Sequence, residues 1–165
     1  MRGQGGSFLF FFSPTKGRLT VQETTADIYA FLQEDPLAKY KVIIGTDSQT
    51  NKKSTLFVSA LIIHRIGKGA RFYYQKKLLK PFKTLQARIY QETQLSLSLV
   101  DHLKKDGIAK LLADWPLEIH LDIGQHGETR QLIQEVVGWV TSIGFIVKIK
   151  PDSFGASSVA DKFTR

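Results

Sequence analysis

The chain has 165 residues, 42% of them hydrophobic and 23% charged, which suffices for one globular domain with a real core. It contains no cysteine, which excludes disulfides and cysteine-based zinc sites and suits a reducing compartment, so we expect a cytoplasmic protein. The formal net charge of +8 favours polyanionic partners, nucleic acid first, although a merely soluble basic domain would carry the same charge.

The N-terminal segment opens with the aromatic run 8–12. This run is too short to span a bilayer and no small-residue cleavage site follows it, so we expect a strand or core-docking arm and no membrane association. Residues 20–34 predict a helix, because Thr20 and Glu23 fit a capping box and apolar residues recur on one face. The pair Asp35-Pro36 ends it.

The rest of the chain alternates between strand and helix patterns. Residues 41–48, 56–64 and 70–79 predict three strands, and the short turns between them predict an antiparallel meander. The later segments predict a long helix over 84–105, a strand over 117–123, a helix over 128–143 ended by Gly144, a strand over 145–149 and a short helix over 157–163.

This order predicts an α/β fold with a five-stranded mixed sheet. Strands separated by helices should pair in parallel through right-handed crossovers, after the three antiparallel strands. We expect helices on both faces of the sheet. We also expect one domain over residues 1–165, with residues 1–40 forming an N-terminal arm and helix packed on it.

Three carboxylates interrupt the apolar patterns. Asp47 ends the first strand of the meander and Asp122 ends the fourth strand, where ligands gather in open α/β sheets. Glu92 lies within roughly 60° of the inward leucine and isoleucine stripe of its helix, so it predicts a buried carboxylate that meets a positive partner. An Asx turn at Asp47 and a structural salt bridge at Glu92 are the alternatives.

Clustered carboxylates repel one another unless cations lie between them. Because the chain offers oxygen ligands and no thiols, Mg²⁺ or Mn²⁺ is the expected ion. Two such ions about 4 Å apart would activate a water and stabilise the leaving oxygen of a phosphodiester. A fourth acid could come from Asp152, directly after the fifth strand, or from Asp161, in the last predicted helix.

The chain resembles the ribonuclease H-like superfamily in its element order and in Thr46-Asp47-Ser48, which ends the first strand of the meander. Nearly the whole chain is similar to a small family of uncharacterised bacterial proteins predicted to be ribonuclease H-like nucleases. The stretches that carry this resemblance are SPTKG (13–17), IIGTDSQ (43–49), ET (92–93) with Ser96, HLDIG (120–124), GETR (127–130) and KPDSFGASSVADK (150–162).

The resemblance implies a metal-dependent nuclease that hydrolyses RNA, DNA or a hybrid by a two-metal mechanism. It implies that the catalytic, metal-binding acids are Asp47, Glu92, Asp122 and Asp161, and it favours Asp161 over Asp152 as the fourth. The superfamily motifs taken singly are weak, because one Asp after a strand is common, whereas the six stretches together are specific.

Several polar residues beside these acids are candidate substrate contacts. His126 could move a proton and Arg130 opens a helix where backbone N–H groups favour anions, and the alternative for both is an ordinary solvated surface residue. His120 could support Asp122, and the alternative is a satisfied core histidine. The expected substrate-binding residues are Ser48, Gln49, His126, Arg130 and Lys150.

Two other functions fit the same residues. The net charge and the basic run 76–83 fit a non-catalytic nucleic-acid-binding module, and the acids fit a hydrolase of small phosphoesters. Actin-like ATPases need glycine-rich phosphate loops, and haloacid-dehalogenase-type phosphatases need an Asp two positions after the first, where this chain has Gln49. The sequence does not define the oligomeric state.

Overall fold

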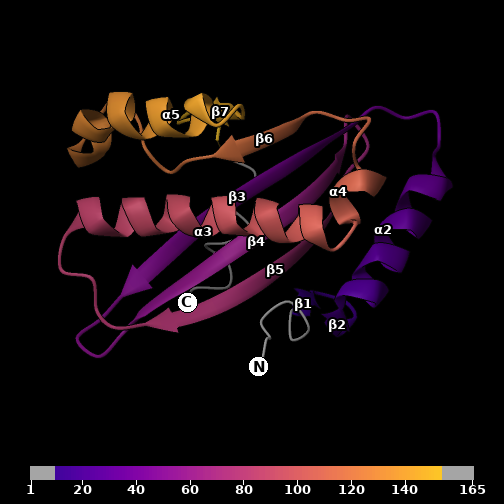
Figure 1. Cartoon of the computed structure of the whole chain (residues 1–165), viewed down its shortest axis with the longest axis horizontal. Helices are drawn as coiled ribbons and strands as arrows, with labels where there is room; N and C mark the ends of the chain where they lie inside the picture. The colour runs from indigo at the N-terminus through magenta and orange to yellow at the C-terminus, as the bar shows by residue number, and fades with distance from the viewer. Residues whose placement is uncertain (1–9, 154–165) are drawn as a thin grey trace.

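The computed structural model describes residues 10–153, whose strands form one seven-stranded sheet in the order β2-β1-β5-β4-β3-β6-β7 (Figure 1). The three central strands β5, β4 and β3 are antiparallel, and β6 and β7 continue parallel to β3. The strands are β1 (Phe10–Ser13), β2 (Gly17–Thr20), β3 (Tyr40–Thr50), β4 (Thr55–Arg65), β5 (Ala70–Leu79), β6 (Leu117–His120) and β7 (Ile146–Lys148).

The two longest helices begin where side chains cap them. Thr20 accepts from the backbone N–H of Glu23, whose carboxylate accepts from the backbone of Thr20, so the predicted capping box is present. Thr84 caps the long helix in the same way, through Ala87. The helices are α2 (Val21–Glu34), α3 (Leu85–Lys105), α4 (Ile108–Leu111), the 3₁₀ helix η1 (Glu128–Leu132) and α5 (Ile133–Ser142).

The prediction of five strands was wrong, because the aromatic run and the SPTKG stretch form an additional hairpin. Strands β1 and β2 pair antiparallel, and β1 joins the edge of β5 through Phe12 and Tyr74. Lys16 in the turn of this hairpin forms an ion pair with Asp27 of α2, which also accepts from Arg71 and Tyr73 of β5. The hairpin is therefore tied to both the helix and the sheet.

The prediction of helices on both faces was also wrong for the part of the chain that the structure describes. One core cluster contains apolar residues from α2, α3, α4 and α5 together with those of one sheet face. The crossover from β5 to β6 and the crossover from β6 to β7 move in the same direction across the sheet. Two right-handed crossovers in one direction place their helices on the same face. The predicted helix over 157–163 lies outside the described residues.

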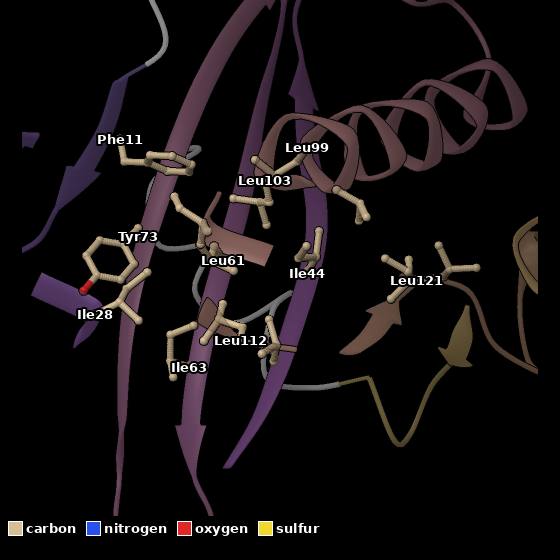
Figure 2. Packing of buried hydrophobic residues seen from close by; sticks show 14 of the residues in the cluster. Phe11, Ile28, Ile44, Leu61, Ile63, Tyr73, Leu99, Leu103, Leu112 and Leu121 are labelled. Carbon is tan, nitrogen blue, oxygen red and sulfur yellow. The ribbon is translucent and has the colours of Figure 1, made fainter. Parts of the chain in front are cut away.

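The core lies between this sheet face and α3. Figure 2 shows Ile44 and Leu61 of the central strands facing Leu99 and Leu103 of α3. Alternate residues of both strands enter this cluster, as the pleat of a strand requires: Tyr40, Val42 and Ile44 of β3, and Leu61 and Ile63 of β4. On the other face, Ile43 and Ile62 form a separate small cluster.

Two predicted boundaries differ near the acids. Strand β6 ends at His120 and not at residue 123, because its pairing with β3 stops at Gly45–His120 while β3 continues to Thr50. The helix predicted over 128–143 begins as η1, since no side chain caps it at Gly127. No helix between residues 10 and 153 is long and apolar enough to cross a membrane.

Candidate functional site

Asp47 and Asp122 stand where two neighbouring parallel strands separate. Gly45 of β3 is paired with His120 of β6, so each aspartate lies two residues beyond the last pair. Side chains alternate along a strand, and the residues flanking each aspartate face α3 or the core: Thr46 and Ser48 bond to α3, and Leu121 and Ile123 are in the core cluster. Both aspartates therefore belong to the sheet face away from α3.

Glu92 lies on the α3 side of this edge of the sheet. Its side chain is buried, with 6% of the residue exposed, and Ser48 donates a hydrogen bond of 2.5 Å to its carboxylate. Burial, helped by the negative charges of Asp47 and Asp122, raises the pKa of Glu92 to about 8, against the opposing effects of Ser48 and Arg88. Both aspartates thus lie within electrostatic reach of Glu92.

A row of hydroxyls runs beneath α3 beside Glu92. Thr46 contacts both Ser96 of α3 and Ser59 of β4, each at 2.8 Å between oxygens. Together with the Ser48–Glu92 bond, this row fixes one turn of α3 against β3. Sequence reasoning missed Thr46 and Ser59 as members of this network. The signal was present, because both are polar residues on the apolar face of a buried strand.

Asp122 has a positive partner in Lys150, with 2.9 Å between Nζ and Oδ1. The chain after β6 and the chain after β7 remain paired here, since Lys150 donates its backbone N–H to Ile123. Gly124 lets them approach closely, because a Cβ at this position would lie 3.1 Å from the Cβ of Lys150. This approach explains why the HLDIG stretch carries a glycine.

His120 and Glu118 form a buried pair on the sheet face that carries Asp122. Nε2 of His120 lies 2.9 Å from Glu118, which also pairs with Lys41 at 3.7 Å. Burial lowers the pKa of His120 despite the neighbouring carboxylate, so the imidazole is neutral near pH 7. Nε2 then donates to Glu118, while Nδ1 is buried without a hydrogen-bond partner in the described structure.

The remaining predicted contacts are exposed. Gln49 follows Asp47 on β3, and His126 and Arg130 lie beyond Asp122, where Thr129 accepts from the backbone of Gly124 and closes the intervening loop. Lys150 is 58% exposed at its side chain. Asp152 is exposed as well, and Asp161 lies outside the described residues.

The donor set suits a hard divalent cation. Asp47, Glu92 and Asp122 offer only oxygens. Burial and then the charges of the two aspartates raise the pKa of Glu92, and a bound cation would offset the repulsion between these charges and Glu92. The acids are not preassembled: within residues 10–153, no three histidines and carboxylates stand as one metal-binding group. The chemistry of the residues fits Mg²⁺ or Mn²⁺, with Asp122 now held by Lys150.

Comparison with known proteins agrees with the mixed α/β fold. A family described as "Ribonuclease H-like" matches residues 23–165. The chain belongs to the ribonuclease H-like family. This family member is 40% identical to the "Uncharacterized protein YkuK" of Bacillus subtilis (strain 168), over 96% of this chain and 98% of the relative. No solved structure matches the chain.

Proposed function

We propose that this ribonuclease H-like protein is a metal-dependent nuclease that hydrolyses phosphodiester bonds of RNA or DNA. The observation that carries the proposal is that Asp47 and Asp122, from two other segments, act electrostatically on the buried carboxylate of Glu92. A fold does not require a buried carboxylate on an inward helix stripe, and an unneutralised one is costly. The presence of such a carboxylate at Glu92, near two further acids, favours a catalytic cation site.

Under this proposal Asp47, Glu92, Asp122 and Asp161 hold two Mg²⁺ or Mn²⁺ ions, which supply Lewis-acid stabilisation of the phosphoryl charge. The chain's own residues do the positioning. Ser48 orients the carboxylate of Glu92 through its 2.5 Å hydrogen bond. Lys150, which reaches Asp122, and the exposed Arg130 and Gln49 offer charge and hydrogen bonds to the phosphate backbone.

The test is a cleavage assay on the full chain with end-labelled single-stranded RNA, single-stranded DNA and RNA–DNA hybrid. We expect fragments of at least one polymer in millimolar Mn²⁺ or Mg²⁺, and none in EDTA. A small phosphodiester, assayed in parallel, should be hydrolysed much more slowly than the polymer, since it lacks the neighbouring phosphates that the protein would contact. Equal turnover of the small ester would instead identify a small-phosphoester hydrolase.

A non-catalytic nucleic-acid-binding module is the second candidate. The Lys150–Asp122 ion pair favours it, because a lysine already neutralises one of the acids, and so does the net charge of +8. Salt-dependent binding to the same polymers, with no cleavage in any of Mg²⁺, Mn²⁺, Co²⁺ or Zn²⁺, would select this function and reject the nuclease.

A further inference from the structure

A second candidate site lies away from the acids, at the edge of β5. A cavity of about 410 Å³ opens between β1, β5 and α3, within the size range of small-ligand sites. On the side away from β4, the described strands pair with β5 only at Tyr74, through Phe12 of β1. The cavity lies beside the residues of β5 that follow Tyr74.

The lining of this cavity combines cations with aromatic rings. Arg18, Lys76 and Lys77 supply positive charge, and the half-buried rings of Phe10 and Phe12 supply apolar surface. None of the described residues that line the cavity is acidic. His102 of α3 closes the opposite side.

The three cations are available to a ligand. In the described part of the chain neither Arg18 nor Lys76 nor Lys77 forms an ion pair with a carboxylate, whereas six other basic residues do: Lys16, Lys41, Arg65, Lys68, Arg71 and Lys150. Arg18 instead lies over the ring of Phe10, at 3.8 Å from its centre. This contact orients the guanidinium while leaving its donors for an anion.

The aromatic side of the cavity is also organised. Phe12 stacks on Tyr74 with 5.6 Å between ring centres, and Lys76 lies 6.0 Å from the ring of Tyr74. Cationic side chains beside stacked aromatic rings are the combination that binds single-stranded nucleic acid, because phosphates contact the cations while bases stack on the rings. A base inside a duplex has no free face to offer such rings.

The cavity shares α3 with the acids. Leu95 and Leu99 of α3 line it, one and two turns after Glu92 on the same helix. Ser59, another lining residue, belongs to the hydroxyl row that reaches Thr46 beside Asp47. A strand bound in the cavity therefore lies along the same helix as Glu92.

We propose that the cavity between β1, β5 and α3 binds single-stranded nucleic acid, with Phe12 stacking on a base and Arg18 and Lys77 holding phosphates. This inference rests on the proposed function, because the bound strand would be the substrate of the nuclease. It adds the substrate class: a single strand, or a single-stranded region, in place of a continuous duplex.

The test measures binding of a fluorescent dT₂₀ oligonucleotide and of a blunt 20-base-pair duplex to full-length protein carrying Asp47→Asn, in EDTA. Adding Phe12→Leu, which keeps the apolar bulk, should weaken dT₂₀ binding by about five-fold or more and leave duplex binding within about two-fold. Adding Arg18→Gln and Lys77→Gln should reduce the slope of log K against log salt by about 1.4 for dT₂₀.

The matched control is Lys39→Gln with Lys110→Gln, which removes the same charge from two exposed lysines outside the cavity. It should bind dT₂₀ more tightly than the cavity pair does. Equal losses for the two pairs, or equal losses of single strand and duplex with Phe12→Leu, would overturn the inference; thermal unfolding verifies that each variant is folded. If these binding differences are observed but no polymer is cleaved, the nuclease proposal is rejected and the proposed binding site in the cavity is retained.

Discussion

Asp47→Asn and Asp122→Asn are each expected to lower the rate of nucleic-acid cleavage by about 1,000-fold or more while leaving the protein folded. Asparagine keeps the size of the side chain and removes the charge that binds the cation. Loss of several kcal/mol of transition-state stabilisation corresponds to a rate loss of this size. Single-turnover cleavage with excess enzyme, at fixed Mn²⁺, measures the effect without interference from product release.

Two controls accompany this measurement. Asp114→Asn removes a carboxylate from an exposed position after α4 and should retain full activity. Asp152→Asn should also retain activity, and Asp161→Asn should lose it, if Asp161 is the fourth acid. Cleavage that persists unchanged in both Asp47→Asn and Asp122→Asn would mean that another group, or a contaminating nuclease, performs the reaction.

Glu92→Gln is expected to stabilise the cation-free protein at high pH. The folded-state pKa of Glu92 is about 8, against an ordinary value of 4.5, because burial and the charges of Asp47 and Asp122 oppose ionisation. A carboxyl with a raised pKa holds its proton more tightly in the folded state, so the parent protein loses stability as pH rises from about 4.5 to about 8. Glutamine has no proton to lose.

The free energy of unfolding by urea in EDTA, measured at pH 5, 7 and 9, tests this expectation. Parent and Glu92→Gln should be similar at pH 5, and the variant should be more stable at pH 9 by an amount on the order of 4 kcal/mol. Glu128→Gln, at an exposed position, should follow the parent at every pH. Parallel curves for parent and Glu92→Gln would show that Glu92 ionises freely.

Local signals in the sequence predicted the elements well. Thr20 with Glu23 located the start of α2, the turn glycines located the start of the strand Ala70–Leu79, and the period of the long helix placed Glu92 in its buried stripe. Each of these signals depends on residues a few positions apart, so a single chain displays it. Family resemblance then joined Glu92 to Asp47 and Asp122.

Features that depend on long-range pairing could not be predicted. Asp27 looks like an ordinary helix residue, yet Lys16, Arg71 and Tyr73 surround it from the hairpin and from β5. The hairpin itself has strands of four residues each, too short for an alternating pattern to identify. The early end of β6 follows from the divergence of β3, and the Lys150–Asp122 pair follows from the register of β7.

The central claim is that acids from distant segments hold divalent cations at one place. Crystals of the full chain grown with Mn²⁺ and measured at the manganese absorption edge test it most directly. We expect anomalous density between the carboxylates of Asp47, Glu92 and Asp122, with Lys150 displaced from Asp122. The claim is contradicted if crystals grown at a Mn²⁺ concentration that supports cleavage show no manganese at this place and an intact Lys150–Asp122 pair.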